Sequence, residues 1–491
     1  QSVAMLRIES RMDLSVEAAV WDRLLNIPAS FFRRYTAGDL AMRAMGISYI
    51  RQSLTQSASS SLLTFFASII YFGLLFYFDS RLALWAVGLF LLIVGATCLS
   101  VIFQLPYERE QQHHRGRVWG IVLQLFTGIS RLRVAGAEER ALAYWARHYS
   151  QQTRATIRSQ LVANNLGAFI ATLPILAPLA IFASISLFPS KTLSVPLFMA
   201  FYAAFTVIIM SAITMSRTIS SLLDVIPLFE RAKPILEATP EFDRGKRNPG
   251  QLSGEIEVSH VSFRYHEDGP LILDDVSLQI RPGEYVAFVG PSGAGKSTVL
   301  RLLLGFETPI AGSIYYDRED LANVDQLAVR RQIGVVLQDG KLMPGDILSN
   351  ITGSAPLTLE DAWEAARLSG LDEDIQQMPM GMYTFLSDGE STLSGGQRQR
   401  LMIARAIVKK PNLLFFDEAT SALDNVTQAK VSQSLDNLKA TRVVIAHRLS
   451  TVINADRIIV IDKGQLVQQG SYDELVEQKG LFSDLVKRQL L

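Results

Sequence analysis

Four long stretches of uncharged, mainly apolar residues in the first half of this chain set the strongest constraint on its fold. They are Ser61–Phe78, Leu82–Leu105, Leu161–Phe188 and Val195–Met215. A helix needs about 20 residues, with a range of about 17–25, to cross the hydrocarbon core of a bilayer. One such stretch is compatible with a helix buried in a large soluble domain, but four in so short a segment favour membrane spans. The sequence therefore predicts an α-helical transmembrane domain with four spans.

The connections between these stretches predict their orientation. The segment Pro106–Gln160 contains nine arginines and four glutamates, whereas the connections Asp79–Arg81 and Pro189–Ser194 are short. Arginine-rich loops stay on the cytoplasmic side of a membrane. We therefore expect the long segment inside the cell, as two helical arms joined by a turn at Gly128–Glu139, and the short turns outside. Alternatively the arginines only keep long helices soluble, which also places them in water.

Composition excludes several classes of protein. The 491 residues include 47 Lys plus Arg and 47 Asp plus Glu, so the chain lacks the net positive charge expected of a nucleic-acid binder. Hydrophobic residues make up 49%, which excludes a disordered chain. The single cysteine, Cys98, excludes an internal disulfide framework and a cysteine-cluster zinc site.

The sequence changes character after the last apolar stretch. We expect the helix to continue to about Ala238, so that residues 1–238 form the transmembrane domain with its cytoplasmic arms. A linker rich in Pro, Gly and charge follows at 239–254, and residues 255–491 alternate short β-type runs with helical segments. This alternation indicates an α/β domain with a largely parallel sheet. Its predicted strands are Ile256–Phe263, Tyr285–Val289, Gly334–Leu337, Leu413–Phe416, Arg442–Ala446 and Ile458–Ile461.

A glycine-rich loop in the second domain predicts a nucleotide site. Residues 290–298 read GPSGAGKST, which fits the phosphate-loop pattern G-x-x-x-x-G-K-[ST] between a strand and a helix. Its glycines let backbone N–H groups close around phosphate oxygens, and the N-terminus of the following helix favours the same anion. Lys296 adds a charge for the β- and γ-phosphates, and the Ser297 hydroxyl suits Mg²⁺. The predicted phosphate-binding residues are Gly290, Pro291, Ser292, Gly293, Ala294, Gly295, Lys296, Ser297 and Thr298.

Two carboxylates end an apolar strand farther along the chain, in the segment LLFFDE. Asp417 is predicted to hold Mg²⁺ through water, as the acid at the end of such a strand does in phosphate-loop ATPases. Glu418 is predicted to polarise the attacking water as a general base. By itself such a pair more often caps a helix. Together with a phosphate loop, the catalytic interpretation is favoured.

A third motif, LSGGQ at Leu393–Gln397, places small residues before a helix whose N-terminus again favours an anion. One nucleotide cannot easily contact both this motif and the phosphate loop of the same domain. Two such domains arranged head to tail would enclose two nucleotides between them. The sequence therefore predicts that the chain works with a second, similar domain.

Together with the SALD segment at Ser421–Asp424 and a downstream histidine, these motifs resemble the ATP-binding cassette (ABC) transporters of the exporter type. The resemblance covers essentially the whole chain. It implies a multi-domain fold, with an α-helical transmembrane domain followed by an α/β P-loop ATP-binding cassette. It also implies an ATPase that uses ATP and Mg²⁺ to move a substrate outward across a membrane.

The resemblance assigns further residues to the ATP site. It implies that Tyr265 stacks on adenine, that Gln338 contacts Mg²⁺ and water, and that His447 contacts the γ-phosphate. The implied catalytic residues are Glu418, His447 and Gln338, and the implied metal-binding residues are Ser297, Gln338 and Asp417. The residues implied to bind nucleotide also include Asp424 and, toward the ATP of the partner domain, Ser394, Gly395, Gly396 and Gln397. The segment Asp388–Glu390 departs from the usual exporter pattern and leaves coupling there in doubt.

Exporter subunits of this type have six spans, and the four in this chain resemble the third to the sixth. We therefore expect two further spans upstream of Gln1, so that the chain is a fragment of a longer protein. Residues 1–60 would then be the return arm of the first intracellular loop. The expected partner is a second half-transporter, in a homodimer or a heterodimer.

Two segments narrow the resemblance. GISRLRVAGAEERALAYWARHY and VVLQDGKLMPGDILSNI resemble the bacteriocin-export ABC subunits associated with nitrile-hydratase-type leader peptides. This implies export of a modified peptide across the bacterial inner membrane, with the ATP-binding domain in the cytoplasm. The alternatives are a lipid or multidrug exporter, or a poorly hydrolysing nucleotide-gated membrane protein. The presence of Glu418, His447 and LSGGQ argues against the last of these.

Overall fold

The computed structural model describes residues 2–187, 194–241, 245–338, 340–386, 393–418, 423–446 and 448–490. Within these ranges, some side chains are left out of the description, among them those of residues 56–63 and 65. The chain divides into two compact units, Gln1–Glu241 and Phe242–Leu491, and each is described here by itself.

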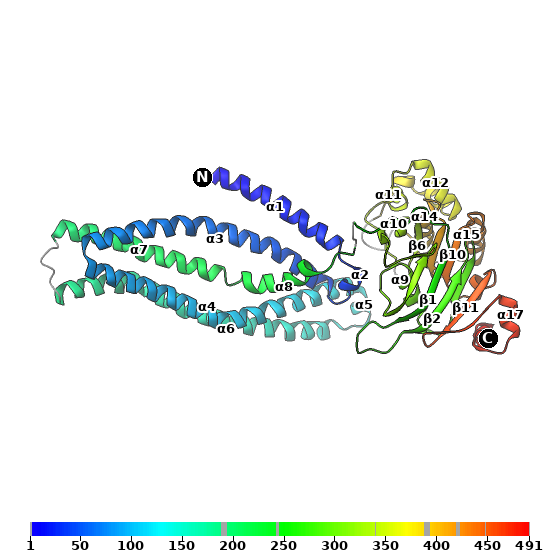
Figure 1. Ribbon diagram of the computed structural model, residues 1–491, viewed down its shortest axis with the longest axis horizontal. Coiled ribbons are helices and arrows are strands. Elements are labelled where there is room, and N and C mark those ends of the chain that lie inside the picture. The colour runs from blue at the N-terminus through cyan, green and yellow to red at the C-terminus, as the bar shows by residue number, and fades with distance from the viewer. Residues whose placement is uncertain are drawn as a thin grey trace. The chain divides into compact units, whose positions relative to one another are not determined.

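The described part of the first unit is helical, and its long helices run side by side (Figure 1). Asp79 ends one long helix and starts the next, because its side chain accepts hydrogen bonds from the backbone N–H groups of Arg81 and Leu82 at 2.9 and 3.1 Å. The predicted turn at Asp79–Arg81 is therefore confirmed. The helices are α1 (Ser2–Leu25), α2 (Ala29–Phe32), α3 (Ala37–Phe78), α4 (Ser80–Thr127), α5 (Ile129–Val134), α6 (Glu138–Leu187), α7 (Val195–Ser221) and α8 (Val225–Glu237).

Three described helical segments are long and apolar enough to cross a membrane: Ser80–Thr127, Glu138–Ala183 and Val195–Glu237. The predicted stretch Ser61–Phe78 lies partly outside the residues with described side chains, and its described part, Phe66–Phe78, is a shorter apolar segment. Only 22% of the most apolar window of α4 is buried within the chain. Most of its apolar surface therefore requires lipid or another helix as its neighbour.

Two details of the helical unit differ from or add to the prediction. The last helix does not continue unbroken to Ala238, because α7 ends at Ser221 and a turn precedes α8. Between α4 and α7, the buried hydroxyls of Thr97 and Ser216 share a hydrogen bond of 2.6 Å. Such a bond links two helices where hydrocarbon offers no other partner for a hydroxyl.

Glycines allow a close contact between the start of α3 and the middle of α4. A Cβ atom on Gly38 would lie 3.0 Å from the Cα atom of Gly120. One turn earlier on α4, Gly116 faces the Asp39 carboxylate and the Arg231 guanidinium of α8, which form an ion pair. Asp39 also pairs with Arg43 at 2.7 Å. The Asp39 carboxylate therefore pairs with two guanidinium groups at the point where α3, α4 and α8 meet.

Substituting Gly116 by alanine tests this contact. The added methyl group would overlap both Arg231 and Asp39, so we expect Gly116→Ala to lower the free energy of unfolding by about 1–3 kcal/mol. Thermal unfolding of the detergent-solubilised protein measures the change. Gly167→Ala on α6 is the matched control, because no atom lies within 4 Å of its Cβ position. Equal melting temperatures for the two variants would contradict the packing described here.

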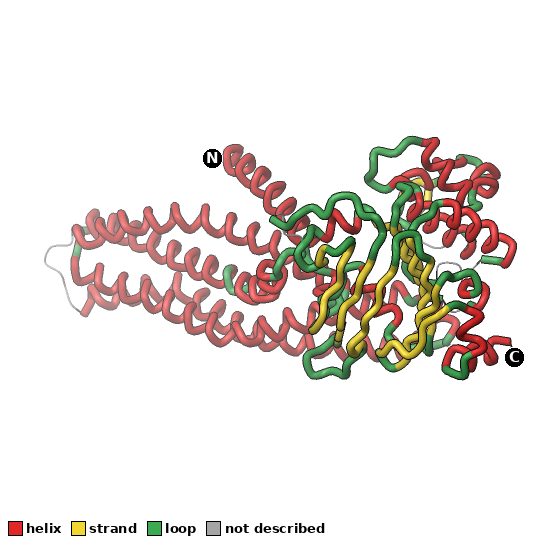
Figure 2. Tube along the Cα trace, turned by 45° about the vertical axis from the view of Figure 1, so that its right-hand side comes forward, coloured by secondary structure: helices red, strands yellow, loops and turns green. Residues whose placement is uncertain are grey.

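The second unit contains two main sheets, whose strands are drawn in yellow in Figure 2. One is antiparallel, with the order β2-β1-β4-β5, and the other has the order β12-β11-β3-β10-β9-β6. In the second sheet every pairing is parallel except that of β12. The strands are β1 (Ile256–Phe263), β2 (Leu273–Ile280), β3 (Tyr285–Val289), β4 (Ala311–Tyr316), β5 (Glu319–Asp320), β6 (Ile333–Val336), β7 (Gly345–Asp346), β8 (Phe385–Leu386), β9 (Leu413–Asp417), β10 (Thr441–Ile445), β11 (Arg457–Asp462) and β12 (Gln465–Gly470).

The predicted strands are confirmed to within a residue at each end, and so is the largely parallel core sheet. The antiparallel sheet was not predicted. The short strands β7 and β8 form a separate pair. The helices of this unit are α9 (Lys296–Leu303), α10 (Gln326–Arg330), α11 (Ile347–Thr352), α12 (Leu359–Leu368), α13 (Asp372–Gln377), α14 (Gly395–Ile407), α15 (Asn425–Asn437), α16 (Leu449–Val452), α17 (Tyr472–Glu477) and α18 (Leu481–Leu490), with a 3₁₀ turn at Gly381–Tyr383.

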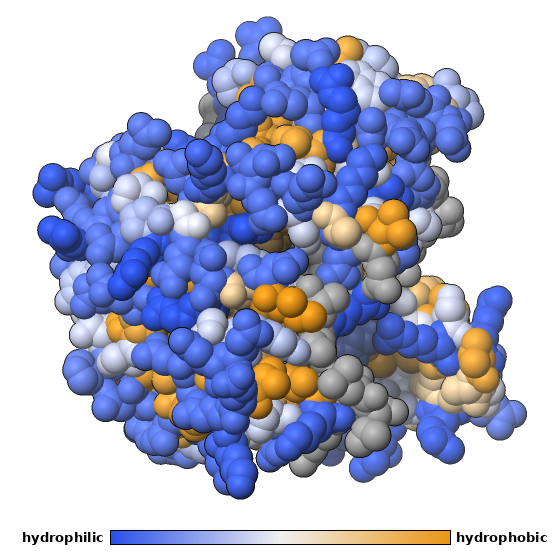
Figure 3. All heavy atoms as spheres, turned by 90° about the vertical axis from the view of Figure 1, so that its right-hand side faces the viewer, coloured by the Kyte–Doolittle hydropathy of each residue, from blue (hydrophilic) through white to orange (hydrophobic). Residues whose placement is uncertain are grey.

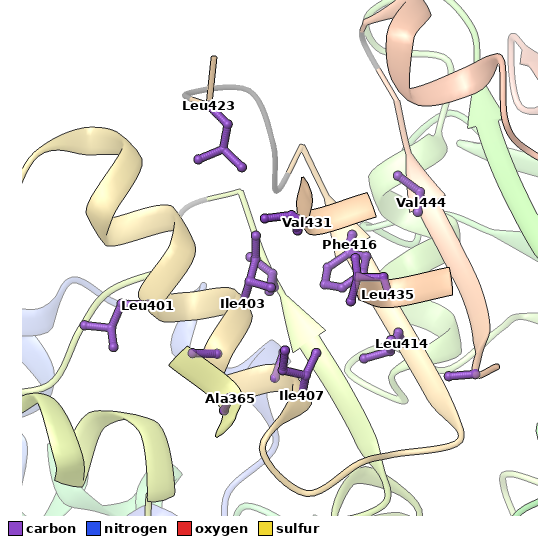
Figure 4. Close-up of a cluster of buried hydrophobic side chains, with 14 of the residues drawn as sticks. Ala365, Leu401, Ile403, Ile407, Leu414, Phe416, Leu423, Val431, Leu435 and Val444 are labelled. Carbon is purple, nitrogen blue, oxygen red and sulfur yellow. The ribbon is translucent and has the colours of Figure 1, made fainter. Parts of the chain in front are cut away.

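Alternating residues of the parallel sheet fill two separate cores. On β9, Leu414 and Phe416 pack into one core with α12, α14 and α15, as Figure 4 shows. Leu413 and Phe415 point to the other face, where they pack with α9 and the antiparallel sheet. A strand buried on both faces reads as a continuous apolar run, as LLFF does. The outer surface seen in Figure 3 is mainly hydrophilic, with small apolar areas.

Candidate nucleotide site

The phosphate loop joins β3 to α9 at the carboxyl end of the parallel sheet, where ligands bind in open α/β folds. Gly290, Gly293 and Gly295 have φ angles of +152°, +81° and +108°, which side-chain-bearing residues rarely adopt. A side chain at Gly290 would collide with the carbonyl oxygen of Ile461 on β11. One at Gly295 would lie 2.8 Å from Leu273 of the antiparallel sheet. The loop is therefore held against both sheets.

Lys296 is 5% exposed and folds over its own loop. Its Nζ donates hydrogen bonds to the carbonyl oxygens of Gly290 at 2.8 Å and Pro291 at 3.0 Å. Burial lowers the pKa of its ammonium group, while the charges of Glu418 and Asp417 act in the opposite direction. These carboxylates thus lie close enough to interact with the cation intended for the phosphates.

Asp417 and Glu418 stand at the end of β9, between β10 and β6 in the sheet. Asp417 is 7% exposed. Glu418 has a φ angle of +54°, and its backbone N–H donates to the carbonyl oxygen of Ile445 at 3.3 Å. A non-glycine residue with this φ is held by its surroundings, and such residues are frequent at active sites.

Gln399 of α14 holds the same turn from the other side. Its Nε2 donates to the carbonyl oxygen of Glu418 at 3.0 Å, and the Gln399 residue is 8% exposed. Sequence reasoning did not identify this residue. The signal available was its position, two residues after LSGGQ, but contact with a residue 19 positions away is not readable from spacing.

Tyr265 reaches the loop from the segment after β1. Its hydroxyl shares a hydrogen bond of 3.0 Å with the Thr298 hydroxyl, and its ring stands edge-on against Phe263 at 4.9 Å between centroids. Thr298 is 6% exposed. The tyrosine therefore lies beside the phosphate loop, as an adenine-stacking residue must.

The LSGGQ motif begins α14 as predicted. Ser394 caps the helix by accepting from the Gln397 N–H at 3.2 Å, while Gln397 Oε1 accepts from the Ser394 N–H at 2.9 Å. Gln397 Nε2 also donates to Asp374 at 2.8 Å, and Arg400 pairs with Asp374 at 2.7 Å. These contacts fix the start of α14 while Ser394 and Gly395 remain exposed.

For the remaining predicted site residues, the structure shows fewer contacts. Ser297 is exposed in the first turn of α9, and Gln338 is exposed just after β6, which pairs with β9. Asp424 caps α15 by accepting from the N–H groups of Val426 and Thr427, both at 3.1 Å, and hydrogen bonds from Thr427 lower its pKa. Its predicted nucleotide contact stays a prediction. His447, Ser421 and the segment 388–390 lie outside the described residues.

The residues present fit Mg²⁺ bound together with a nucleotide. The described residues contain no cluster of three or more His, Cys, Asp or Glu side chains that would hold a metal by themselves. Mg²⁺ instead favours one or two carboxylates plus phosphate oxygens and water. Asp417 at the end of β9 and the Ser297 hydroxyl in the first turn of α9 supply that donor set.

Comparison with known proteins places both units in one family. A model described as "ABC transporter" matches residues 273–421, and one described as "ABC transporter transmembrane region" matches residues 1–212. The leukotoxin translocation ATP-binding protein LktB of Mannheimia haemolytica is 34% identical over 490 residues, which are 98% of this chain and 69% of that protein. The protein of the same name from Bibersteinia trehalosi gives the same identity and coverage.

A solved structure matches the whole chain. It is a bacterial Atm1-family ABC exporter with ATP bound, superimposed with a TM-score of 0.86 at 26% sequence identity. The alignment covers 100% of this chain and 87% of that one.

Alanine substitutions in the phosphate loop distinguish the cost of a steric clash from the cost of a positive φ angle. Gly290→Ala adds a methyl group that collides with the Ile461 carbonyl, so we expect a loss of about 3 kcal/mol or more in unfolding free energy. Gly293→Ala has a positive φ but no atom within 4 Å, so we expect a loss of about 1 kcal/mol. Thermal unfolding of both variants without nucleotide measures the difference, and a larger loss for Gly293→Ala would contradict this geometry.

Proposed function

This chain belongs to the ABC transporter family. On that basis we propose which of its residues hydrolyse ATP, which partner subunit it needs and which substrate it exports. The chain is an ABC exporter subunit with an ATP-binding cassette, and its ATPase drives export of a substrate across a membrane. The residue roles, the metal, the partner and the cargo given below are our proposals.

The proposed ATPase mechanism rests on one observation: the phosphate loop, with Lys296 folded over it, follows β3 in the same sheet in which β9 leads to Asp417 and Glu418. Backbone N–H groups of the loop and Lys296 bind the phosphates and balance their charge. Glu418 accepts a proton from the attacking water, and the Gln399 contact keeps its backbone in position. Gln338 and His447 complete the polar surroundings of the γ-phosphate.

Mg²⁺ would be held by Ser297, Asp417 and Gln338. When bound, it would neutralise part of the negative charge that develops on the phosphates during hydrolysis. Tyr265 would stack on the adenine ring, since its position beside Thr298 leaves the base next to the phosphate loop.

ABC exporters usually function as dimers in a membrane. We infer that the exposed start of α14, with Ser394, Gly395, Gly396 and Gln397, contacts the nucleotide bound by the cassette of a second half-transporter. The capping box supports this, because it satisfies the end of the helix internally and leaves the remaining N–H groups directed at an anion. A second copy of this chain or a related subunit provides the same surfaces.

The proposed cargo is a polypeptide, exported across the bacterial inner membrane with the cassette in the cytoplasm. The relatives that match 98% of this chain are bacterial proteins named for leukotoxin translocation. The predicted resemblance to bacteriocin-export subunits points to the same chemical class. Both support a peptide or protein substrate over a lipid or drug.

Removing the proposed general base tests the mechanism. Glu418→Gln should leave ATP affinity within about twofold and lower ATP turnover by about 10²–10⁴-fold, the usual contribution of a general base. Steady-state hydrolysis and fluorescent-nucleotide binding, in the purified protein reconstituted in liposomes, measure the two effects. Glu477→Gln on the exposed face of α17 is the control and should change neither. Wild-type turnover in Glu418→Gln would refute the assignment.

Two substitutions at Tyr265 separate stacking from hydrogen bonding. Tyr265→Ala removes the ring and should weaken ATP binding by about tenfold, since stacking on an aromatic ring contributes about 1–3 kcal/mol per base. Tyr265→Phe loses only the bond to Thr298 and should bind nearly as well. Titration with a fluorescent ATP analogue measures both affinities. Equal losses in the two variants would show that the hydroxyl, and not the ring, matters.

A further inference from the structure

A cavity in the helical unit, separate from the nucleotide site, carries a strong positive charge. Its volume is about 550 Å³, within the range of about 300–1,000 Å³ typical of ligand sites. It lies between the start of α3, the second half of α4, and α8. Five arginines and two acidic residues are among the described residues that line it, an excess of three positive charges. The arginines are Arg34, Arg43, Arg109, Arg117 and Arg231, and the acids are Asp39 and Glu230.

The acids of the cavity wall are already engaged. Asp39 pairs with both Arg43 and Arg231, and Glu230 binds Arg109 through two hydrogen bonds of 3.0 and 2.6 Å. Within the described part of the chain, the side chains of the other two arginines, Arg34 and Arg117, have no carboxylate or hydrogen-bond partner. Their planar guanidinium groups match carboxylate or phosphate ligands.

A buried amide in the same wall lacks a partner. Gln112 is 5% exposed, and its Oε1 atom has no hydrogen bond among the described residues. Buried polar atoms in folded proteins are nearly always satisfied, by protein, water or ligand. An oxygen requires a donor, and the backbone N–H groups of a peptide supply one. The cavity thus offers cations for carboxylates and an acceptor for an N–H group.

The position along the helices separates the cavity from the bilayer. At a rise of about 1.5 Å per residue, Arg117 lies about 18 Å beyond the end of the apolar stretch at Leu105. On α3, Arg43 lies about 27 Å from the start of the apolar stretch at Ser61. The headgroup layer adds only about 5–8 Å on each side of the hydrocarbon core. A lipid headgroup would reach Arg109 at most, whereas a soluble ligand reaches the whole cavity.

From these observations we propose that the cavity binds an acidic segment of the exported polypeptide before it enters the membrane. Carboxylates of the segment pair with Arg34 and Arg117, and a backbone N–H donates to Gln112. This proposal rests on the proposed function, because it takes a polypeptide as the cargo. It adds a recognition site on the cytoplasmic portions of the spanning helices and a preference for negative charge.

Peptide binding to the reconstituted full-length protein tests the proposal. The probe is a fluorescein-labelled eight-residue peptide with four aspartates, and its control is the same peptide with four asparagines. We expect the aspartate peptide to bind at least tenfold more tightly at low salt by fluorescence anisotropy. The double variant Arg34→Gln/Arg117→Gln should weaken that binding about tenfold, and Arg140→Gln, outside the cavity, should leave it unchanged.

Several outcomes would overturn the proposal. Equal affinity for the two peptides, or unchanged affinity in the double variant, would show that the cavity does not select acidic segments. Competition by liposomes rich in anionic lipid, but not by neutral ones, would assign the cavity to a headgroup. Basal ATP hydrolysis should be equal in the double variant and the wild type, which verifies folding. A double variant that no longer hydrolyses is replaced by the single variants Arg34→Gln and Arg117→Gln, each of which should weaken the binding.

A transport measurement distinguishes failure of this site from failure of the proposed function. ATP-dependent uptake of a secreted polypeptide into inverted vesicles, without peptide binding at the cavity, would leave the cargo class standing and refute the site. Peptide binding without uptake of any polypeptide would refute the cargo class, and with it the role of the cavity in recognising cargo.

Discussion

The close approach of backbone at the phosphate loop holds the whole cassette together. Gly290 lies against the carbonyl of Ile461 on β11, and Gly295 lies against Ile272 and Leu273 at the start of β2. Strands from both sheets therefore converge on the loop at Gly290 and Gly295, where no side chain fits. The helix α9 that follows the loop packs its apolar face between the two sheets. The loop that binds phosphate through its N–H groups thus also joins the two sheets of the domain.

The helical unit is subject to a different constraint. Its apolar surface requires hydrocarbon at one end of the long helices, and its charged side chains require water at the other. In the apolar region, the buried hydroxyls of Thr97 and Ser216 pair with each other. Nearer the arginine-rich connection, Gly116 and Gly120 let helices approach until Asp39 and Arg231 meet. Apolar packing gives way to ion pairs along a single helix, α4, which continues through Pro106 although proline lacks the N–H of one backbone hydrogen bond.

Features that depend on neighbouring residues in the sequence were predictable, and contacts between distant segments were not. The LLFFDE segment predicted an apolar strand that ends in two carboxylates, and the segment GPSGAGKST predicted a phosphate loop between a strand and a helix. The contacts of Gln399 with Glu418 and of Gln397 with Asp374 join residues 19 and 23 positions apart, which no spacing rule indicates. The antiparallel sheet was missed because its strands β2, β4 and β5 carry polar residues on their exposed face. The break after Ser221 was missed, although Pro227 in the first turn of α8 is a signal for the start of a new helix.

The hydrogen bond from Gln399 to the Glu418 carbonyl links α14 directly to the end of β9. The first turn of that helix is the surface expected to meet the nucleotide of the other cassette. A rotation of α14 would displace the carbonyl group of Glu418 and so change the direction of its side chain. The backbone of Glu418 is already in the unfavourable left-handed region, with a φ angle of +54°. Each subunit would then hydrolyse ATP only when its neighbour has bound nucleotide, because the signal from that nucleotide reaches Glu418 through the Gln399 side chain.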